Sequence, residues 1–189
     1  MRFCPACGAA LDLRRPEGDE RERHVCPACG QVHYQNPKIV VGSVCTLGDD
    51  RLLLCRRAIP PRAGFWTIPA GYLELGETAE EGARREAWEE ARARIELQGL
   101  LAVYSVARID QVQLLYRARL LDASVEPGPE SLEVRLLGWA DIPWERLAFP
   151  TVRWILKRAQ VVRDRPGPLV TVGNPGDRQP EPVAGEGAV

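Results

Sequence analysis

The segment Gly71–Ala93 constrains the fold of this 189-residue chain more than any other. It reads GYLELGETAEEGARREAWEEARA, a glycine-containing loop followed by a run rich in alanine, arginine and glutamate. Thr78–Glu81 fits a capping box, in which a Thr side chain and a Glu three residues later satisfy free backbone groups at the start of a helix. An apolar stripe suited to close packing on a sheet comes from four alanines, Ala79, Ala83, Ala87 and Ala91. The sequence therefore predicts a loop that leads directly into a helix packed on a sheet.

Three carboxylates fall on one side of this helix. Glu86, Glu89 and Glu90 are related by spacings of three and four residues, so their side chains project close together. Like charges at this spacing destabilise an isolated helix by about 0.2–0.5 kcal/mol per pair. The cluster therefore indicates a hard divalent cation bound through oxygen, Mg²⁺ or Mn²⁺, and the cation suggests a phosphate ligand. The alternative is a solvated helix face, because Glu and Arg are good helix formers.

The spacing of Gly71, Glu77 and Arg85–Glu90 resembles the Nudix box, G-x5-E-x7-R-E-U-x-E-E-x-G-U. The chain departs from this pattern at two positions: Arg92 stands where the box has its late glycine, and Ala93 stands where it has a bulky apolar residue. That glycine normally ends the helix at positive φ, where another residue costs about 1 kcal/mol. The departures concern the helix cap and leave the carboxylates in place.

Four of the six cysteines form two Cys-Pro-Ala-Cys pairs that are separated by eighteen residues, and each pair is followed by a glycine. The four are Cys4, Cys7, Cys26 and Cys29. Four thiolates at about 2.3 Å satisfy tetrahedral Zn²⁺, so the spacing predicts a structural zinc ribbon in a segment too short to build a core. Two disulfides or redox-active pairs are the alternatives.

Two histidines and two further cysteines require separate interpretation. His24 and His33 flank the second cysteine pair, and either could replace a cysteine as a ligand, although four cysteines already complete the set. Cys45 and Cys55 lie inside apolar runs, where free cysteine behaves as a small hydrophobic residue. We expect them in the core.

A ribbon followed by the box, together with Tyr34–Lys38, Trp66–Tyr72 and Pro127–Glu133, resembles the zinc-ribbon Nudix hydrolases, most closely the branch that cleaves FAD or ADP-ribose. The Ser-Gln-Pro-Trp-Pro-Phe-Pro signature of the NADH pyrophosphatases is not found. The resemblance implies an α/β fold, an α/β/α sandwich around a mixed sheet, preceded by a small N-terminal zinc ribbon.

We expect a ribbon over residues 1–34, a Nudix domain over 35–163 and a Pro/Gly-rich, flexible tail over 164–189. Between the cysteine pairs, residues 14–23 are expected to form a solvated hairpin or loop. Gly48–Asp50 is a hairpin signal between the first two strands of the second domain, and Leu169–Val172 is compatible with an edge strand. The predicted strands are Lys38–Leu47, Arg51–Arg57, Leu97–Arg108, Val112–Leu121 and Glu133–Ala140. The predicted helices that follow are a short one from Asp141–Trp144 and a longer one over Thr151–Val162.

By the resemblance, the chain hydrolyses the pyrophosphate bond of a nucleoside-diphosphate-linked substrate, most readily FAD, giving AMP and FMN, or ADP-ribose. NADH and nucleoside triphosphates are alternative substrates. The implied Mg²⁺ or Mn²⁺ ligands are Glu86, Glu89 and Glu90, with the carbonyl of Gly71 as a further one. Arg85 and Glu77 are implied to form a buried ion pair that holds the loop to the helix.

The general base and the substrate contacts are less well defined by the sequence. Glu130 and Glu133 are candidates for the base, and we favour Glu133 because it directly precedes the strand Val134–Trp139. For substrate binding we select Trp66 and Tyr72, whose aromatic faces could stack on a base, and Arg56. Tyr104 and Arg57 are further candidates.

Composition argues against several other classes of function. The formal net charge is −1 and the pI is about 6.2, which gives no nucleic-acid or membrane footprint. Without a membrane-length apolar run or a signal-peptide core, the chain is expected in the cytoplasm. The resemblance implies a homodimer. Competing readings are a Nudix-fold ligand sensor with a nucleic-acid-binding ribbon, which the mixed charges of residues 14–23 disfavour, and a ribbon used only for assembly.

Overall fold

The computed structural model describes residues 1–48, 50–165 and 170–173. The chain divides into two compact units, Met1–Pro37 and Lys38–Val189. Asp49 of the predicted hairpin and most of the predicted tail, residues 166–169 and 174–189, lie outside the described residues. None of the helices within the described ranges is long and apolar enough to cross a membrane.

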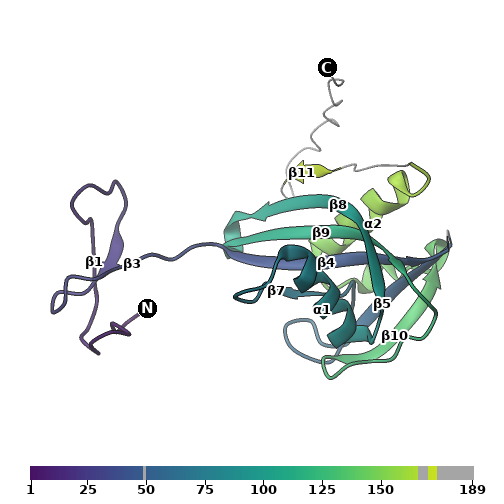
Figure 1. Cartoon of the computed structure of the whole chain (residues 1–189), viewed down its shortest axis with the longest axis horizontal. Helices are drawn as coiled ribbons and strands as arrows, with labels where there is room; N and C mark the ends of the chain where they lie inside the picture. Colours follow the sequence, from purple (N-terminus) through teal and green to yellow (C-terminus); the bar gives the residue numbers. More distant parts are fainter. Residues whose placement is uncertain (49, 166–169, 174–189) are drawn as a thin grey trace, which may run out of the picture. The chain divides into compact units, whose positions relative to one another are not determined.

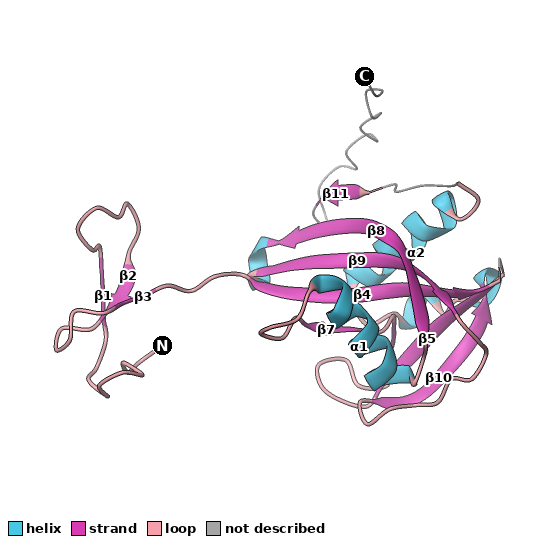
Figure 2. Ribbon diagram, viewed as in Figure 1, coloured by secondary structure: helices cyan, strands magenta, loops and turns pink. Residues whose placement is uncertain are grey.

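The smaller unit is a three-stranded antiparallel sheet in the order β1-β2-β3 (Figure 2). Its strands are β1 (Asp12–Arg14), β2 (Arg23–Val25) and β3 (Val32–His33). As predicted, residues between the two cysteine pairs form a hairpin, since β1 pairs with β2. Among residues 1–37, all of which are described, the buried apolar side chains are Cys4, Val25 and Cys26. The unit therefore has almost no hydrophobic core, and two of its three buried apolar side chains are cysteines.

The larger unit is built on a mixed sheet in the order β10-β5-β4-β9-β8-β11, with β6 paired to β5 and β7 paired to β4 (Figure 1). β4 runs parallel to β9 and β8 runs parallel to β11, whereas the other pairs are antiparallel. The strands are β4 (Lys38–Leu47), β5 (Arg51–Arg57), β6 (Trp66–Thr67), β7 (Ala70–Tyr72), β8 (Ile95–Val106), β9 (Gln111–Leu120), β10 (Ser131–Gly138) and β11 (Thr171–Gly173).

Two helices, α1 (Ala79–Ala91) and α2 (Pro150–Val162), cover opposite faces of this sheet (Figure 1). Successive residues of a strand point to opposite faces, and β4 shows this directly. Val44 belongs to the same buried cluster as Ile155 of α2, whereas its neighbour Cys45 clusters with Ala87 of α1. The arrangement is the predicted α/β/α sandwich, and Cys45 and Cys55 are buried in its core as expected.

The short helix predicted to start at Asp141–Trp144 is found only as 3₁₀ structure and not as an α-helix. Two 3₁₀ turns, η2 (Trp139–Asp141) and η3 (Trp144–Arg146), flank this position instead. Ile142 between them is extended, with φ −60° and ψ 124°. It precedes Pro143, and the proline ring disfavours the helical conformation of the residue before it. The longer helix begins at Pro150, one residue earlier than predicted.

Part of the predicted flexible tail forms a strand. Thr171–Gly173 pairs in parallel with Ala102–Tyr104 of β8, so β11 becomes the last strand on this side of the sheet. The free backbone groups at the edge of β8 favour such a pairing. Thr171 and Val172 belong to the run that the sequence showed to be compatible with an edge strand. The pairing of Thr171–Gly173 corrects the prediction for these three residues, and for the rest of 164–189 the flexible tail stays a prediction.

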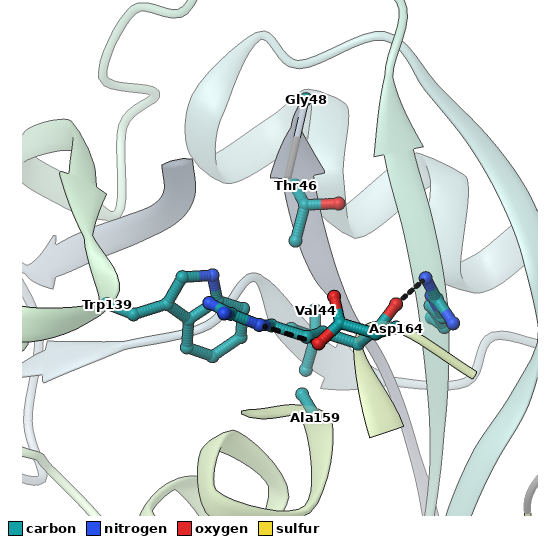
Figure 3. A pocket seen from close by; sticks show the side chains of 8 residues that line it. Val44, Thr46, Gly48, Trp139, Ala159 and Asp164 are labelled. Carbon is teal, nitrogen blue, oxygen red and sulfur yellow. Dashed lines mark hydrogen bonds and ion pairs between the residues drawn. The ribbon is translucent and has the colours of Figure 1, made fainter. Parts of the chain in front are cut away.

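Arg117 on β9 ties the end of α2 to the sheet. Its guanidinium donates to the carbonyl oxygens of Val162, Arg163 and Arg165 at 3.4, 2.7 and 3.1 Å. These carbonyls belong to the last turn and the residues after it, where partners within the helix are lacking and a cation is favoured. A small cavity of about 30 Å³ adjoins this contact, lined in part by Val44, Trp139 and Asp164 (Figure 3). The contact of Arg117 with the end of α2 stabilises the fold.

Candidate active site

The loop and helix that carry the carboxylates are fixed at both ends of α1. The Oγ1 of Thr78 accepts from the N–H of Glu81 at 3.2 Å, and the Glu81 carboxylate accepts from the N–H of Thr78 at 2.7 Å, which confirms the predicted capping box. At the other end, Arg92 adopts a left-handed conformation with φ 51°, and its N–H donates to the carbonyl of Trp88 at 2.9 Å. The helix therefore ends where the box normally has glycine, although an arginine occupies the position.

Arg85 connects the loop to the helix. Its guanidinium donates to both carboxylate oxygens of Glu77, at 3.0 and 2.8 Å, and to the carbonyl of Tyr72 at 2.9 Å. Glu77 also accepts from the N–H of Glu74 at 2.7 Å. These bonds, first that from Arg85 and then that from the Glu74 amide, lower the pKa of Glu77 to about 2. The ion pair implied by the resemblance is thus present, but it is partly exposed rather than buried.

The three carboxylates of the helix differ in their surroundings. Glu86 and Glu90 are buried, whereas the Glu89 side chain is about half exposed. Arg85 donates to Glu86 at 2.7 Å and to Glu89 at 2.9 Å, while the buried Oε2 of Glu90 has no hydrogen-bond partner. Burial, followed by repulsion from Glu86, raises the pKa of Glu90 to about 8. Burial also raises the pKa of Glu86.

Gly71 lies against the buried carboxylate of Glu86. A Cβ atom at this position would lie 2.3 Å from Oε1 and 2.5 Å from Oε2 of Glu86, a distance that only glycine avoids. Gly71 is held there by the pairing of β7 with Val41 of β4. The backbone thus closes one side of the carboxylate site.

The donor set suits a hard divalent cation. It consists of carboxylate oxygens, and one of them is buried without a partner. A cation near Glu90 would remove the penalty that its burial places on the charged form. The carboxylates converge less closely than the four thiols of the ribbon, and Arg85 engages both Glu86 and Glu89. Among the residues that the structure describes, the thiols alone form a group of three or more ligand atoms within 4.8 Å.

The four ribbon cysteines fit zinc. The Sγ atoms of Cys4 and Cys29 are 3.8 Å apart, and those of Cys7 and Cys26 are 3.4 Å apart. Four sulfurs around one tetrahedral Zn²⁺ would lie about 3.8 Å from one another. A glycine follows each cysteine pair. The N–H of Gly8 donates to the carbonyl of Cys4 at 2.8 Å, and the N–H of Gly30 donates to that of Cys26 at 2.9 Å. The two glycines have φ of 76° and 75°. Neither histidine of the ribbon joins this group.

A cavity of about 1320 Å³ opens beside the carboxylates of α1. Besides Glu86, Glu89 and Glu90, its lining includes four arginines, Arg57, Arg85, Arg92 and Arg108. Tyr72, Ile109, Phe149 and Trp154 add aromatic and apolar surface. The volume exceeds that of pockets for drug-sized ligands, about 300–1,000 Å³. The cavity therefore combines carboxylates that suit a divalent cation, arginine side chains and an aromatic surface on which a base could stack.

Three residues selected from the sequence lie outside this cavity lining: Glu133, Arg56 and Trp66. Glu133 on β10 pairs with Arg56 at 3.1 Å and also with Arg135. Trp66 is 8% exposed and belongs to the core that contacts α2. Tyr104, the further aromatic candidate, is 2% exposed and also lies in this core.

Neighbouring residues occupy the cavity in their place. Arg57 lines it, donating to the carbonyl of Pro61 at 3.0 Å and lying 5.2 Å from the ring of Phe149. Adjacent strand residues face opposite sides, so only one of Arg56 and Arg57 can do so. Glu130, in the loop before β10, also lines the cavity, and its charge contributes to the raised pKa of Glu86 and Glu90. We therefore transfer the role of candidate base from Glu133 to Glu130.

No local pattern in the sequence indicates the residues that form the far wall of the cavity. Arg108 and Ile109 come from η1 (Ala107–Ile109), Gln111 begins β9, and Phe149 and Trp154 lie at the start of α2. These residues are up to 46 positions apart in the chain, from Arg108 to Trp154. Only the tertiary fold brings them to the box helix.

The fold and the site together define a Nudix hydrolase. The NUDIX domain model matches residues 36–156, and the Nudix N-terminal zinc-ribbon model matches residues 2–35. The chain belongs to the Nudix family and carries the family's N-terminal zinc ribbon. The family and the fold predicted from the sequence are confirmed.

Individual relatives refine this placement. The chain is similar to the NAD-capped RNA hydrolase NudC of Chromobacterium violaceum, with 31% identity over 75% of this chain and 50% of that protein. An ADP-ribose pyrophosphatase of Methanocaldococcus jannaschii is 28% identical over 61% of this chain and 69% of its own length. A crystal structure of a Nudix hydrolase from Nitrosomonas europaea superposes with a TM-score of 0.87 at 48% identity, covering 92% of this chain and 98% of that one. The chain spans about half the length of the NudC relative from Chromobacterium.

Proposed function

We propose that this protein hydrolyses the diphosphate bond of compounds in which ADP is joined to a second group, the class that includes ADP-ribose, NADH and FAD. The observation that carries the proposal is the large cavity in which the buried carboxylate of Glu90, whose Oε2 lacks a hydrogen-bond partner, and the aromatic surface of Phe149 and Trp154 line one space. A diphosphate would occupy the acidic end through a cation, while the appended group would occupy the apolar end. The names of the relatives, an ADP-ribose pyrophosphatase and NAD-capped RNA hydrolases, support ADP-ribose and NAD-type compounds over FAD.

Glu86, Glu89 and Glu90, with the carbonyl of Gly71, would hold Mg²⁺ or Mn²⁺. When bound, the cation supplies charge neutralisation at the phosphoryl oxygens and activation of the attacking water. Arg85 and Glu77 hold the loop so that Gly71 stays against Glu86. Loss of this ion pair would displace the ligands without removing one.

Glu130 is the proposed general base. It is exposed in the loop before β10 and lines the same space as Glu86 and Glu90, so it can accept a proton from water beside the diphosphate. Glu133 is engaged by Arg56 and Arg135, which leaves it less suited to this role.

Arg57 and Tyr72 are the proposed substrate contacts. The guanidinium of Arg57 can donate to a phosphate oxygen from the cavity wall. The Tyr72 ring is 48% exposed at the cavity, with the Lys38 ammonium 5.0 Å from its centroid and Gln111 donating to its hydroxyl at 3.3 Å. An exposed ring held by two neighbours offers a fixed face for stacking.

A capped RNA is the second candidate substrate, favoured by the similarity to NudC over 75% of this chain. NAD at an RNA end carries the same diphosphate as free NAD, so the same carboxylates would serve. The residues between the cysteine pairs carry charges of both signs, which does not favour the ribbon as an RNA-binding surface.

We also retain the homodimer as a proposal, to be measured by light scattering.

The test is a mass-resolved hydrolysis assay with Mg²⁺ that presents ADP-ribose, NADH, FAD and a short NAD-capped RNA to the zinc-loaded protein. Release of AMP from a free dinucleotide, abolished in Glu89→Gln, supports the proposal. Faster cleavage of the capped RNA than of NADH would transfer the assignment to RNA. A folded protein that cleaves none of the four substrates would overturn it and leave the ligand-sensor reading as the next hypothesis.

A further inference from the structure

Arg92 has a strained backbone conformation at the C-terminal end of α1, the helix that carries the three carboxylates. Among the described residues, Arg62, Arg92 and Asp110 are the non-glycine residues with positive φ. Arg92 has φ 51° at the position where the box pattern has glycine, and a glycine there would avoid the strain of the left-handed conformation. A costly conformation retained beside an active site points to a role for the side chain.

The backbone around Arg92 is firmly held. Its own N–H donates to the carbonyl of Trp88, and the N–H of Ala93 donates to the carbonyl of Ala87 at 3.1 Å. The loop before β10 covers the same helix end, since the N–H groups of Glu126 and Gly128 donate to Ala91 and Glu90, both at 3.0 Å. The direction in which the Arg92 side chain leaves the helix is therefore fixed by the fold.

The guanidinium of Arg92 is not neutralised by the nearby acids. Glu89 lies three residues earlier, a spacing at which ion pairs form on helices. Arg92 instead lies over the ring of Trp88, 5.5 Å from its centroid, and forms no ion pair within the part of the chain that the structure describes. Trp88 is 48% exposed, so the indole serves as a surface shelf and not as core. Arg85, in contrast, is engaged by Glu77, Glu86 and Glu89.

Arg92 lines the same cavity as Glu89, Glu90 and Glu130. Arginine presents several N–H donors in a planar fork that matches phosphate oxygens, and it keeps its charge at any working pH. An arginine aimed at a phosphoryl group can stabilise the charge that develops during its transfer. Because Arg92 and the carboxylates of α1 line one cavity, a diphosphate bound there can contact both.

We propose that Arg92 binds an oxygen of the substrate diphosphate that the metal does not coordinate, with Trp88 holding the guanidinium in place. This inference rests on the proposed diphosphatase function and adds a substrate-binding residue at a position where the box pattern itself has none. The left-handed conformation of Arg92 lowers the stability of the fold, and the contact with the diphosphate is the functional gain that accompanies this loss.

The experiment compares Arg92→Gly, Arg92→Lys and the wild type, with Arg84→Gln as the matched control. Arg84 is an exposed arginine of the same helix that does not line the cavity. Binding of α,β-methylene ADP-ribose in the presence of Mg²⁺ is measured by calorimetry, stability by urea unfolding, and kcat/KM with the substrate that the wild type cleaves fastest.

We expect Arg92→Gly to unfold at the same or a higher urea concentration than the wild type, yet to bind the analogue about tenfold more weakly or worse and to lose a similar factor in kcat/KM. Arg92→Lys should retain part of the affinity, and Arg84→Gln should stay within about twofold of the wild type. Binding and kcat/KM of Arg92→Gly within about twofold of the wild type overturn the inference alone. Absence of hydrolysis of every candidate substrate by the wild type refutes the proposed function. If the wild type cleaves a candidate but does not bind the analogue, kcat/KM of Arg92→Gly with that candidate decides the inference.

Discussion

Gly71 lies in direct contact with the carboxylate of Glu86, so that an added methyl group would lie 2.3 Å from its Oε1. Two segments are held together by this contact, the short strand β7 and the box helix α1. The carboxylate cannot move away easily, because Arg85 holds the same oxygen at 2.7 Å. The geometry of the metal-type site therefore depends on the absence of a side chain at position 71.

Replacing Gly71 with alanine should displace Glu86 and weaken the site. We expect Gly71→Ala to lower kcat by about tenfold or more and to require more Mg²⁺ for half-maximal rate. The pairing of β7 with β4 uses backbone groups, so the variant should still fold. A Mg²⁺ titration of the hydrolysis rate, run beside Glu86→Gln, measures the effect. An unchanged Mg²⁺ dependence would show that position 71 does not control the ligand.

The buried carboxyl of Glu90 should make the Mg²⁺-free protein less stable at high pH. Its pKa of about 8 in the folded protein lies above the ordinary value of 4.5, so folding favours the protonated form. The contribution of protonated Glu90 to the free energy of unfolding is therefore fully present below about pH 4.5. It is lost as the pH rises towards about 8. The shift sets an upper limit on the order of 5 kcal/mol on this loss.

Urea unfolding of Mg²⁺-free protein between about pH 5 and 8 tests this dependence. Glu90→Gln, which cannot ionise, should show a smaller loss of stability over the same range. Adding Mg²⁺ at the upper pH should restore the wild type and leave the variant largely unchanged. Equal pH slopes for both proteins would contradict the assignment of this titration to Glu90.

Replacing each candidate base with glutamine in turn shows which of Glu130 and Glu133 acts in the reaction. Glu130→Gln should lower kcat by about 10²–10⁴-fold, the usual contribution of a general base, with folding unchanged because the side chain is exposed. Glu133→Gln removes an ion-pair partner of Arg56 outside the cavity and should stay within about threefold of the wild type. Steady-state rates at saturating substrate decide between them. The reverse ranking would return the role to Glu133.

Removing one ribbon cysteine should unfold the smaller unit alone. Cys26→Ser should lower zinc content from about one ion per chain and expose the amides of β2 and β3 to hydrogen exchange, because this unit has almost no core. The main thermal transition of the larger unit should remain. Cys45→Ala, which changes a cysteine outside the cluster, should keep its zinc. Full zinc retention by Cys26→Ser would refute the four-thiolate site.

Several features of the molecule follow from residues that are close together in the chain. The capping box at Thr78, the ion pair between Glu77 and Arg85 and the two glycine turns of the ribbon each depend on groups within eight residues of one another. The strand bounds Lys38–Leu47 and Arg51–Arg57 were likewise predicted as the structure has them. Hydrogen bonds and steric limits between near neighbours are set by local sequence, so pattern and spacing suffice to predict them.

The sequence by itself thus determined the box helix with its carboxylates and the two cysteine turns. Which of Arg56 and Arg57, and which of Glu130 and Glu133, lines the cavity was decided only by the tertiary structure, as was the wall formed by Phe149 and Trp154. Strand pairing sets which face each residue presents, and the packing of α2 on the sheet sets what lies opposite. These contacts join residues far apart in the chain, and no local pattern records them.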